Sequence, residues 1–584
     1  MLWLALHLPL LPLEAFCATL TVAQRARPVV LLGQHPHQHQ VHSLNAVALE
    51  RGLKPGNRRA TALALAADLL VAERHAAREA AALQAVVHAA LAFTPAVTTQ
   101  GGVDLLSAAP TQAPQSSHRS MQSPTVLLEV QASLRLFGGL AALCRRLLAA
   151  LAPLGHRVQM AAAPTAQGAA LLAQWRPVVV NEANEVNGMN RVDGLAELDS
   201  VPGAPARSLP ALQALLGPAP LTLLAAGQAH ADLLQGMGLH TLDDLRALPR
   251  AGLVRRCGPA LLDELDRAWG LQPDPRPWLQ AAPSFETRLE LLARADTTDQ
   301  VLHAAAVLLA RLVAWAQARQ GRIAAFTLCM LHEARRQAPV PATELRVELA
   351  APALDPAHLQ LLLRERLARC TLVAPTLELR LQCRHLVAAA APNGELFPTR
   401  ASQQQGLLRL LERLCARLGE DQVQRLMAVA DHRPEHASRS VPALSAGPGA
   451  VTGAVTGAVT GAVTGMVKGT GPGTAEIAAA APDARSPPPQ PPPTSAALPL
   501  HRPAWLLPEP LPLAERDLLP VLQGRVLQLL SGPERIETGW WDEHPVARDY
   551  FIAMAHDGSL VWVYRGRLPA PPGQVNWYLQ GRFA

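Results

Sequence analysis

Residues 2–14 of the chain read LWLALHLPLLPLE, and this stretch decides how the rest of the sequence is interpreted. The apolar run 2–6 predicts a buried strand, which Pro9 and Pro12 end because proline cannot continue a central ladder. In α/β enzymes, functional side chains gather where such a strand stops at a loop. Metal chemistry would need carboxylates here, but Ala5 and His7 occupy the useful positions and the first acid is Glu14.

The bulk composition indicates a large intracellular chain. Its 584 residues are enough for three or four domains, and 49% are hydrophobic, so sizeable cores can form. The 52 Lys and Arg residues outnumber the 46 Asp and Glu residues by 6, a balance that permits a polyanionic partner. An odd number of cysteines, 7 in all and none in a CxxC pair, argues against a disulfide framework and a zinc ribbon.

The sequence also indicates where the protein resides. The N-terminus lacks the basic region of a signal peptide, and Pro9, Pro12 and Glu14 interrupt its apolar segment. No later run reaches the roughly 18 uninterrupted apolar residues of a membrane span. We therefore expect a cytoplasmic protein that does not contact a membrane.

Hydrophobic periodicity predicts an α+β multidomain chain. Strands and helices alternate through residues 1–205, with an inserted loop at 100–124 that is rich in Ser, Gln and Pro. Residues 206–275 contain short helices around glycine turns at Gly236, Gly238 and Gly258, as in a helix-hairpin-helix module.

The second half of the chain is expected to contain one further α/β unit and a spacer. Residues 284–390 show a β-α-β-β-α-β order, which is a split βαβ sandwich. Residues 391–440 include an amphipathic helical region at 407–429. Residues 441–500 hold Gly-Ala-Val-Thr repeats and polyproline, typical of a disordered linker. Residues 501–584 contain most of the late aromatics and predict a small β-rich domain.

The order of these units resembles the Y-family translesion DNA polymerases, which have a right-hand fold of palm and fingers, a helix-hairpin-helix thumb and a split βαβ little finger. Short local matches over about residues 1–390 carry this resemblance; they lie at 28–30, Ser43 with Asn45, 52–56, 93–95 and 239–245. Four further segments resemble the ImuB group, which are non-catalytic relatives of those polymerases. These segments are 2–16, 134–139 (LRLFGG), 413–419 with 431–435 (DHRPE), and 539–542 with 548–551.

The resemblance implies a degenerate active site. Active members hold two Mg²⁺ ions with three carboxylates. The first two acid positions fall on Ala5 and His7, and the second motif keeps one acid, Glu129. The Tyr and Arg that the family places on the incoming triphosphate fall on Ala46 and Leu49. We therefore expect no catalytic residues, no bound metal and no cofactor.

Other acids leave one alternative open. Asp68 and Asp104 would serve if the metal site were displaced, and the chain would then be an active Y-family DNA polymerase. A third hypothesis is a DNA-binding module unrelated to polymerases that uses the helix-hairpin-helix alone.

The resemblance also implies binding residues. In the unit that tracks duplex DNA in the family, the candidate phosphate contacts are Arg322, Arg335, Arg336 and Arg380, and the thumb turn adds Gly236 and Gly238. The peptide 393–397 (NGELF) resembles the sliding-clamp-binding motif of bacterial polymerases, with Asn393 replacing a glutamine and Leu396 and Phe397 as apolar anchors.

These features together predict an accessory protein of damage-induced mutagenesis and DNA repair. Its expected partners are primer-template DNA and the sliding clamp. By resemblance, an error-prone replicative-type polymerase and a RecA-like accessory protein would bind its C-terminal part.

Overall fold

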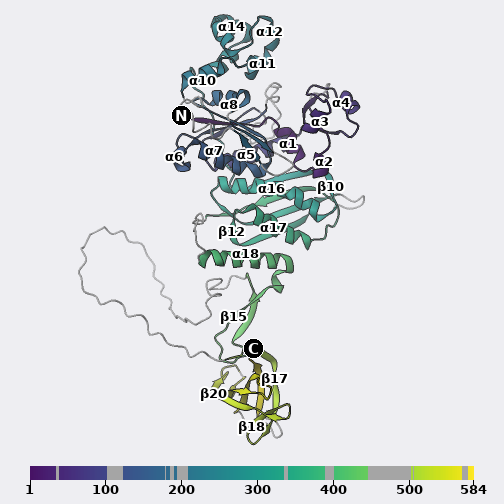
Figure 1. Ribbon diagram of the computed structural model, residues 1–584, viewed down its shortest axis with the longest axis vertical. Coiled ribbons are helices and arrows are strands. Elements are labelled where there is room, and N and C mark those ends of the chain that lie inside the picture. Colours follow the sequence, from purple (N-terminus) through teal and green to yellow (C-terminus); the bar gives the residue numbers. More distant parts are fainter. Residues whose placement is uncertain are drawn as a thin grey trace, which may run out of the picture. The chain divides into compact units, whose positions relative to one another are not determined.

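The computed structural model describes residues 1–33, 39–101, 123–177, 179–183, 190–193, 208–333, 340–388, 400–444, 502–503, 505–542, 544–567 and 576–583. The chain forms two compact units, Met1–Arg417 and Leu418–Ala584 (Figure 1). Mixed sheets and helices make up the first unit and strands dominate the second, which confirms the predicted α+β multidomain class.

The first unit is built around β1 (Trp3–His7), the strand predicted from the opening stretch. It lies inside a six-stranded sheet of order β5-β6-β1-β7-β8-β9, paired antiparallel with β6 (Thr125–Glu129) and β7 (Val158–Ala163). The remaining strands are β5 (Val97–Gln100), β8 (Val179–Ala183) and β9 (Asn190–Asp193).

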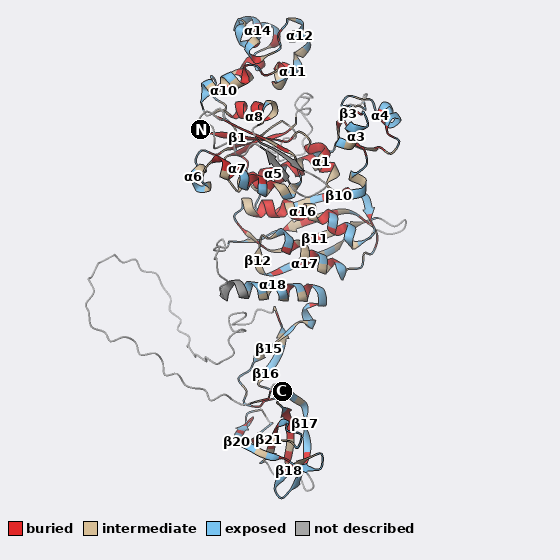
Figure 2. Ribbon diagram, in the orientation of Figure 1, coloured by how far each residue is buried: buried red, intermediate tan, exposed pale blue. Residues whose placement is uncertain are grey.

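Both faces of β1 are covered, because its side chains alternate between two cores. Leu4 and Leu6 pack with α5 (Ala76–Leu91) and α7 (Leu140–Leu151). Trp3 and Ala5 pack with α8 (Ala166–Trp175) on the opposite face. Figure 2 shows the strand and these helices largely buried.

The segment after β1 differs from the expected turn. The turn is confined to Pro9 and Leu10, and α1 (Leu11–Cys17) starts directly after it with Pro12 in its first turn. Proline is tolerated there because the first helical N–H groups have no partner within the helix.

A small subdomain follows α1 and α2 (Val22–Arg25). Its three-stranded sheet has the order β3-β2-β4, formed by β2 (Val29–Leu32), β3 (Val41–Leu44) and β4 (Leu70–Glu73), with helices α3 (Ala46–Glu50) and α4 (Arg59–Leu65). The Asn45 side chain fixes α3: its Oδ1 accepts hydrogen bonds from the N–H groups of Val29 and Ala48, both at 3.0 Å.

The all-helical region predicted for residues 206–275 is present. It consists of α10 (Leu209–Leu216), α11 (Ala225–Ala229), α12 (Ala231–Gly236), α13 (Leu242–Ala247), α14 (Arg250–Cys257) and α15 (Ala260–Trp269). The pairs α12–α13 and α14–α15 are two helical hairpins, and their leucines share a core with α8.

The β-α-β-β-α-β unit is also present. In chain order it contains β10 (Phe285–Ala295), α16 (Thr298–Ala318), β11 (Arg322–His332), β12 (Thr343–Ala353), α17 (Pro356–Ala368) and β13 (Thr376–Cys383). The sheet order is β10-β13-β11-β12, and β14 (Leu386–Val387) adds to β11. Both helices pack on one face, leaving the other face open.

Helix α16 is, within the described residues, the one helix long and apolar enough to cross a membrane. About two thirds of its most apolar window, 67%, is buried inside the protein. Val301, Leu308 and Trp315 belong to the core of the β-α-β-β-α-β unit. A core helix and a spanning helix pass the same test of length and composition.

The predicted helical region 407–429 is only partly helical. Helix α18 (Arg400–Leu418) ends at Gly419, and β15 (Gln424–Ala428) pairs with β16 (Ser438–Pro442). The helical interpretation of 424–428 is therefore wrong. Gly419 has φ +110°, which ends the helix, and Arg425 and Met427 alternate with more exposed neighbours as in a strand.

The second unit holds the predicted β-rich terminal domain. Its seven-stranded sheet has the order β19-β18-β17-β23-β22-β21-β20. The strands are β17 (Trp505–Arg516), β18 (Leu519–Leu522), β19 (Arg525–Val526), β20 (Gln528–Thr538), β21 (Val546–Met554), β22 (Leu560–Gly566) and β23 (Trp577–Arg582). Tyr550 stacks on Trp562 with ring centroids 4.1 Å apart.

An ionic network joins the β15–β16 turn to this sheet. Arg433, with a side chain only 7% exposed, donates to Asp431 at 2.7 Å and to Asp542 at 2.5 Å. The hydrogen bonds from Arg433 hold the pKa of Asp431 down, at about 2. Glu435 accepts from Arg548 at 3.0 Å and from Gln580 at 3.0 Å. Segments 109 residues apart therefore belong to one folded body.

We predict that Arg433→Met lowers the melting temperature of the second unit by several degrees. The substitution leaves the carboxylates of Asp431 and Asp542 close together without their shared cation. Near-UV circular dichroism of the full chain follows the transition, and all 3 tyrosines lie in this unit whereas the 10 tryptophans are divided between the two units. The matched control is Arg439→Met, an exposed arginine on β16. Equal effects of the two substitutions would contradict the prediction.

Candidate functional site

The first position where the resemblance expects a metal ligand is closed. Ala5 is 0% exposed; it lies between Leu127 of β6 and Ala161 of β7, and its methyl group faces the core shared with α8. A methyl group cannot coordinate Mg²⁺, which prefers oxygen ligands. The alanine therefore completes a hydrophobic layer.

His7, the second of these positions, is held by a neighbouring threonine. Its Nδ1 lies 3.0 Å from Oγ1 of Thr125, and the ring is buried. Burial lowers the pKa of His7 to about 4, so the imidazole is neutral at physiological pH.

Glu129, the one acid of the second motif, binds the backbone. Its Oε1 accepts hydrogen bonds from the N–H groups of Leu2 at 3.3 Å and Gln131 at 3.2 Å. Leu127, Leu128 and Val130 around it are buried and apolar. Across the described part of the chain, no group of three or more His, Cys, Asp or Glu residues is placed to hold a metal ion.

Asp68, one of the two acids named for a displaced site, forms no metal-binding group with Glu129 in the described part of the chain. Asp68 lies between α4 and β4, where its carboxylate forms an ion pair with Arg51. The hydrogen bond from Arg51 lowers the pKa of Asp68. Asp104 lies outside the described residues.

The positions expected to contact a triphosphate carry no polar groups and lie on α3. Leu49 is exposed to solvent, whereas Ala46 lines a cavity together with Leu10. Neither side chain can donate a hydrogen bond to a phosphate.

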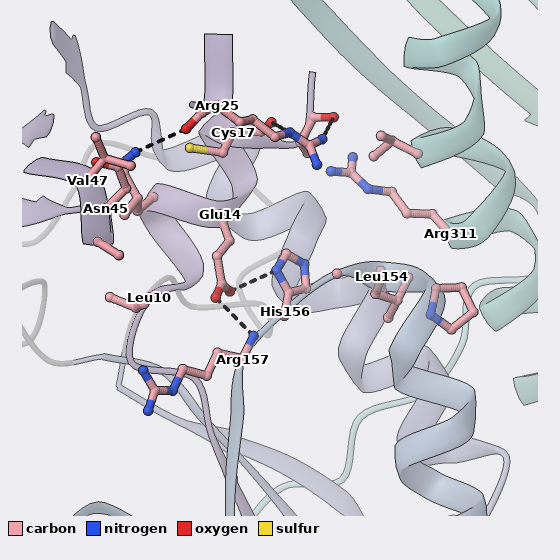
Figure 3. A pocket seen from close by; sticks show the side chains of 17 residues that line it. Leu10, Glu14, Cys17, Arg25, Asn45, Val47, Leu154, His156, Arg157 and Arg311 are labelled. Atoms are coloured by element: carbon pink, nitrogen blue, oxygen red, sulfur yellow. Dashed lines mark hydrogen bonds and ion pairs between the residues drawn. The ribbon is translucent and has the colours of Figure 1, made fainter. Parts of the chain in front are cut away.

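This cavity lies among α1, α3, α16 and the short helix η2 (Ala152–Leu154), and has a volume of about 730 Å³ (Figure 3). Glu14 crosses part of it, with Oε2 3.3 Å from Nδ1 of His156 and Oε1 accepting from the N–H of Arg157 at 3.0 Å. The first acid of the chain therefore fixes the turn that follows η2.

The open face of the β10–β13 sheet has a mixed charge. Arg322 and Arg380, proposed from the sequence as phosphate contacts, belong to this face, whereas Arg335 and Arg336 lie outside the described residues. The strands contribute arginines to this face at 288, 322, 346 and 380, and glutamates at 286, 290, 344, 348 and 378.

Two of these arginines are paired along their own strands. Nε of Arg380 lies 2.7 Å from Glu378, and this hydrogen bond raises the pKa of Arg380. Arg346 lies 2.6 Å from Glu348. A phosphate at either arginine must compete with a glutamate already in place, so this face is less favourable for DNA than its arginines alone suggest.

The glycines proposed for the thumb lie at the end of α12. Gly238 has φ +78°, and its N–H donates to the carbonyl of Gln235 at 2.9 Å. The carboxylate of Asp244 accepts from the N–H groups of His240 and Thr241 at 2.9 and 2.8 Å. Several donors that a phosphate would use in this hairpin are therefore already occupied.

The second hairpin offers residues that the sequence reasoning missed. Arg255 and Arg256 are exposed in the last turn of α14, three and two residues before Gly258, whose φ is +75°. Basic side chains beside a helix-hairpin-helix glycine turn suit backbone phosphates. The available signal was the run Arg-Arg-Cys-Gly between two short helices.

Two exposed tryptophans in the second unit form another missed feature. Trp540 and Trp541 are 81% and 57% exposed, with ring centroids 5.2 Å apart in an edge-to-face arrangement. Gly539 before them has φ +79°, and a Cβ there would come within 2.4 Å of the His544 carbonyl oxygen. Asp542 after them binds Arg433, so both ends of the pair are fixed.

The proposed clamp-binding residues Asn393, Leu396 and Phe397 lie outside the described residues. Their role in clamp binding stays a prediction.

Comparison with known proteins gives one extended similarity. No protein-family model matches the chain. Two ImuB proteins of Caulobacter vibrioides, from strains NA1000 / CB15N and ATCC 19089 / CIP 103742 / CB 15, are each 26% identical over 545 residues. The match covers 91% of this chain and 100% of each relative.

Among solved structures, the insertion ternary complex of Dbh DNA polymerase is 15% identical, with a TM-score of 0.33 over 67% of this chain and 100% of that chain. DinB from Sulfolobus solfataricus gives 15% identity and a TM-score of 0.31 over the same shares, 67% and 100%. In sequence, the chain is similar to ImuB over nearly its whole length, which confirms the resemblance that its motifs indicate.

Proposed function

We propose that this chain is an accessory protein of damage-induced translesion DNA synthesis and mutagenesis. It holds primer-template DNA and the sliding clamp and brings an error-prone polymerase to them, without polymerase activity of its own. The observation that carries the proposal is the closed metal position: Ala5 is buried in an apolar layer, and Glu129 is engaged by backbone N–H groups.

The absence of polymerase activity follows from electrostatics. Two divalent cations a few ångströms apart repel each other strongly, and three converging carboxylates normally offset that repulsion. Here the two positions of the first motif are Ala5 and a neutral His7, and the second motif provides a single carboxylate, that of Glu129. The alternative, an active Y-family DNA polymerase with a displaced metal site, is less well supported because Asp68 is already paired with Arg51.

DNA binding by the chain is supported by charge placed on rigid elements. We assign the main phosphate contacts to Arg255 and Arg256 beside the Gly258 turn, with Arg322 and Arg380 as secondary contacts. Phosphate contact requires only cations held in a fixed position. The neighbouring glutamates predict that the β10–β13 face binds duplex DNA more weakly than the hairpins do.

Partner recruitment is assigned to the second unit. Trp540 and Trp541 offer a large apolar area on a segment that is already ordered, and such aromatics often dominate a protein interface. The error-prone polymerase and the RecA-like accessory protein are the partners we propose for it. A cytoplasmic location fits, since none of the 7 cysteines, all within the described residues, forms a disulfide.

The first prediction from this proposal concerns polymerase activity. Purified protein should incorporate no nucleotide on a primer-template with Mg²⁺ or Mn²⁺, because no cage of carboxylates holds the ions. A gel-based primer-extension assay measures this, with an active Y-family polymerase as the positive control. Template-directed incorporation by this chain would refute the proposal.

The second prediction tests the closed position directly. Ala5→Asp should destabilise the first unit by about 3 kcal/mol, because it buries a carboxylate without a partner. Leu49→Asp, at an exposed position, should change stability by no more than about 0.5 kcal/mol. Urea unfolding measures both. If Mn²⁺ raises the free energy of unfolding of Ala5→Asp, the introduced carboxylate binds metal. That outcome would contradict the closed position.

The third prediction concerns the clamp. Leu396→Ala/Phe397→Ala should abolish capture of the protein by immobilised sliding clamp, since the two side chains are the apolar anchors of the peptide. Glu395→Ala in the same peptide is the control and should be captured like the wild type. Equal capture of all three proteins would remove the clamp from the proposal.

A further inference from the structure

Helix α18 packs on the β-α-β-β-α-β unit through a buried acid. Glu412 is 4% exposed, and its Oε1 accepts hydrogen bonds from the N–H groups of Ala350 and Ala351 of β12, at 2.5 and 3.2 Å. Its Oε2 lies 2.7 Å from Nε2 of His358 on α17. A buried carboxylate held by two backbone N–H groups and an imidazole fixes the helix in position.

Two ion pairs beside Glu412 add to this polar contact. Arg409 lies 3.3 Å from Asp355, and Arg413 lies 3.4 Å from Glu365. The apolar contribution of α18 is small, because Ala416 is its one residue, among those described, that belongs to the buried core of the unit. Charged side chains therefore provide most of the contact between α18 and the unit.

The leucines of α18 lie on another side of the helix. Leu407, Leu410, Leu411 and Leu414 have the spacing i, i+3, i+4, i+7, which places them together on what we call the leucine face. At about 100° per residue, the middle of this face points away from Glu412. Leu410 is 53% exposed and the other three are half-buried. In Figure 2 the described part of α18 is mainly tan and pale blue.

This orientation of α18 is the reverse of the usual one. An amphipathic helix of a soluble protein normally turns its apolar face to the core and its charged face to water. Helix α18 turns its acid and two arginines to the protein, whereas none of the four leucines belongs to the core of the unit among the described residues. Contiguous apolar surface left open in this way is typical of interaction sites.

The exposed rim of the leucine face is basic. Arg413 follows Leu410 by three residues and Arg417 follows Leu414 by three residues, so each exposed arginine neighbours a leucine on the helix surface. Glu412, the one acid in the sequence of α18, is buried. A second copy of this helix would therefore bring leucines but no carboxylate to pair with the arginines.

We propose that the leucine face docks an acidic amphipathic helix of a partner protein. Apolar side chains of the partner would pack on the four leucines, and its carboxylates would pair with Arg413 and Arg417. This docking goes beyond the proposed function, since it uses the first unit and requires neither DNA, the clamp, nor Trp540 and Trp541.

Fluorescence anisotropy of the full-length protein with labelled synthetic helical peptides tests the proposal. One peptide carries leucines at i, i+3, i+4 and i+7 with glutamates along one flank, and a second peptide carries lysines in place of the glutamates. The wild type should bind the glutamate peptide about tenfold more tightly than the lysine peptide. Leu410→Gln/Leu414→Gln should weaken binding of the glutamate peptide about tenfold or more.

The matched control is Leu136→Gln, which changes a leucine that is 78% exposed elsewhere in the first unit and should bind like the wild type. Arg417→Glu should reduce the preference for the glutamate peptide over the lysine peptide, because it reverses one charge of the rim. Equal binding of the glutamate peptide to the wild type and to Leu410→Gln/Leu414→Gln, or no binding to either, would overturn the proposal.

Two further measurements distinguish the occupants of the leucine face. Leu410→Gln/Leu414→Gln should change the melting temperature by no more than about 2 °C, because neither leucine belongs to the core. A larger fall would mean that another part of the chain covers the face. Sedimentation velocity should show the same species for the wild type and this variant. A wild-type dimer that the substitutions abolish would assign the face to a second copy, and either result would refute an acidic partner.

Discussion

The pairing of β1 on both edges and its burial on both faces is the constraint on which the first unit depends. A strand in that position must be apolar at nearly every residue, and Trp3, Leu4, Ala5 and Leu6 satisfy this. A small apolar side chain at Ala5 meets that demand, whereas a carboxylate buried there would need a compensating charge. The packing of β1 therefore disfavours an acid without a partner at this position.

Helices and strands with a regular hydrophobic pattern were predictable from the sequence. Side-chain pairs between residues far apart in the chain were not. The alternating pattern of β10–β13 and the 3.6-residue period of α16 and α17 predict the β-α-β-β-α-β order that the structure has within residues 284–390. The start of α1 was missed because Pro12 was interpreted as a terminator, although the first helical turn accepts proline. Strand β15 was missed because apolar residues at helical spacing, Val423, Leu426 and Met427, continued past Gly419.

The charges of the candidate site show a sharper limit of sequence reasoning. Arg380 can be recognised as a surface cation from its strand, but its register opposite Arg288 and its bond to Glu378 depend on the assembled sheet. Arg433 and Asp542 lie 109 residues apart and could not be paired from the sequence. Arg311 sits in an apolar helix, where sequence patterns indicate a core position and give no sign that its Nη1 is buried without a hydrogen-bond partner among the described residues.

The ties from Arg433 and Glu435 to the terminal sheet also change the meaning of the Gly-Ala-Val-Thr and proline-rich segment. Both of its flanks, the β15–β16 hairpin and the strand β17, belong to one unit. The segment therefore connects two parts of the same unit rather than two separate units. Closing such a connection becomes only about 0.6 kcal/mol more costly each time its length doubles. Repeats of four residues can be gained or lost there during evolution at almost no thermodynamic cost. Such changes leave the length of chain between the two units unchanged, because both flanks of the segment lie in the second unit.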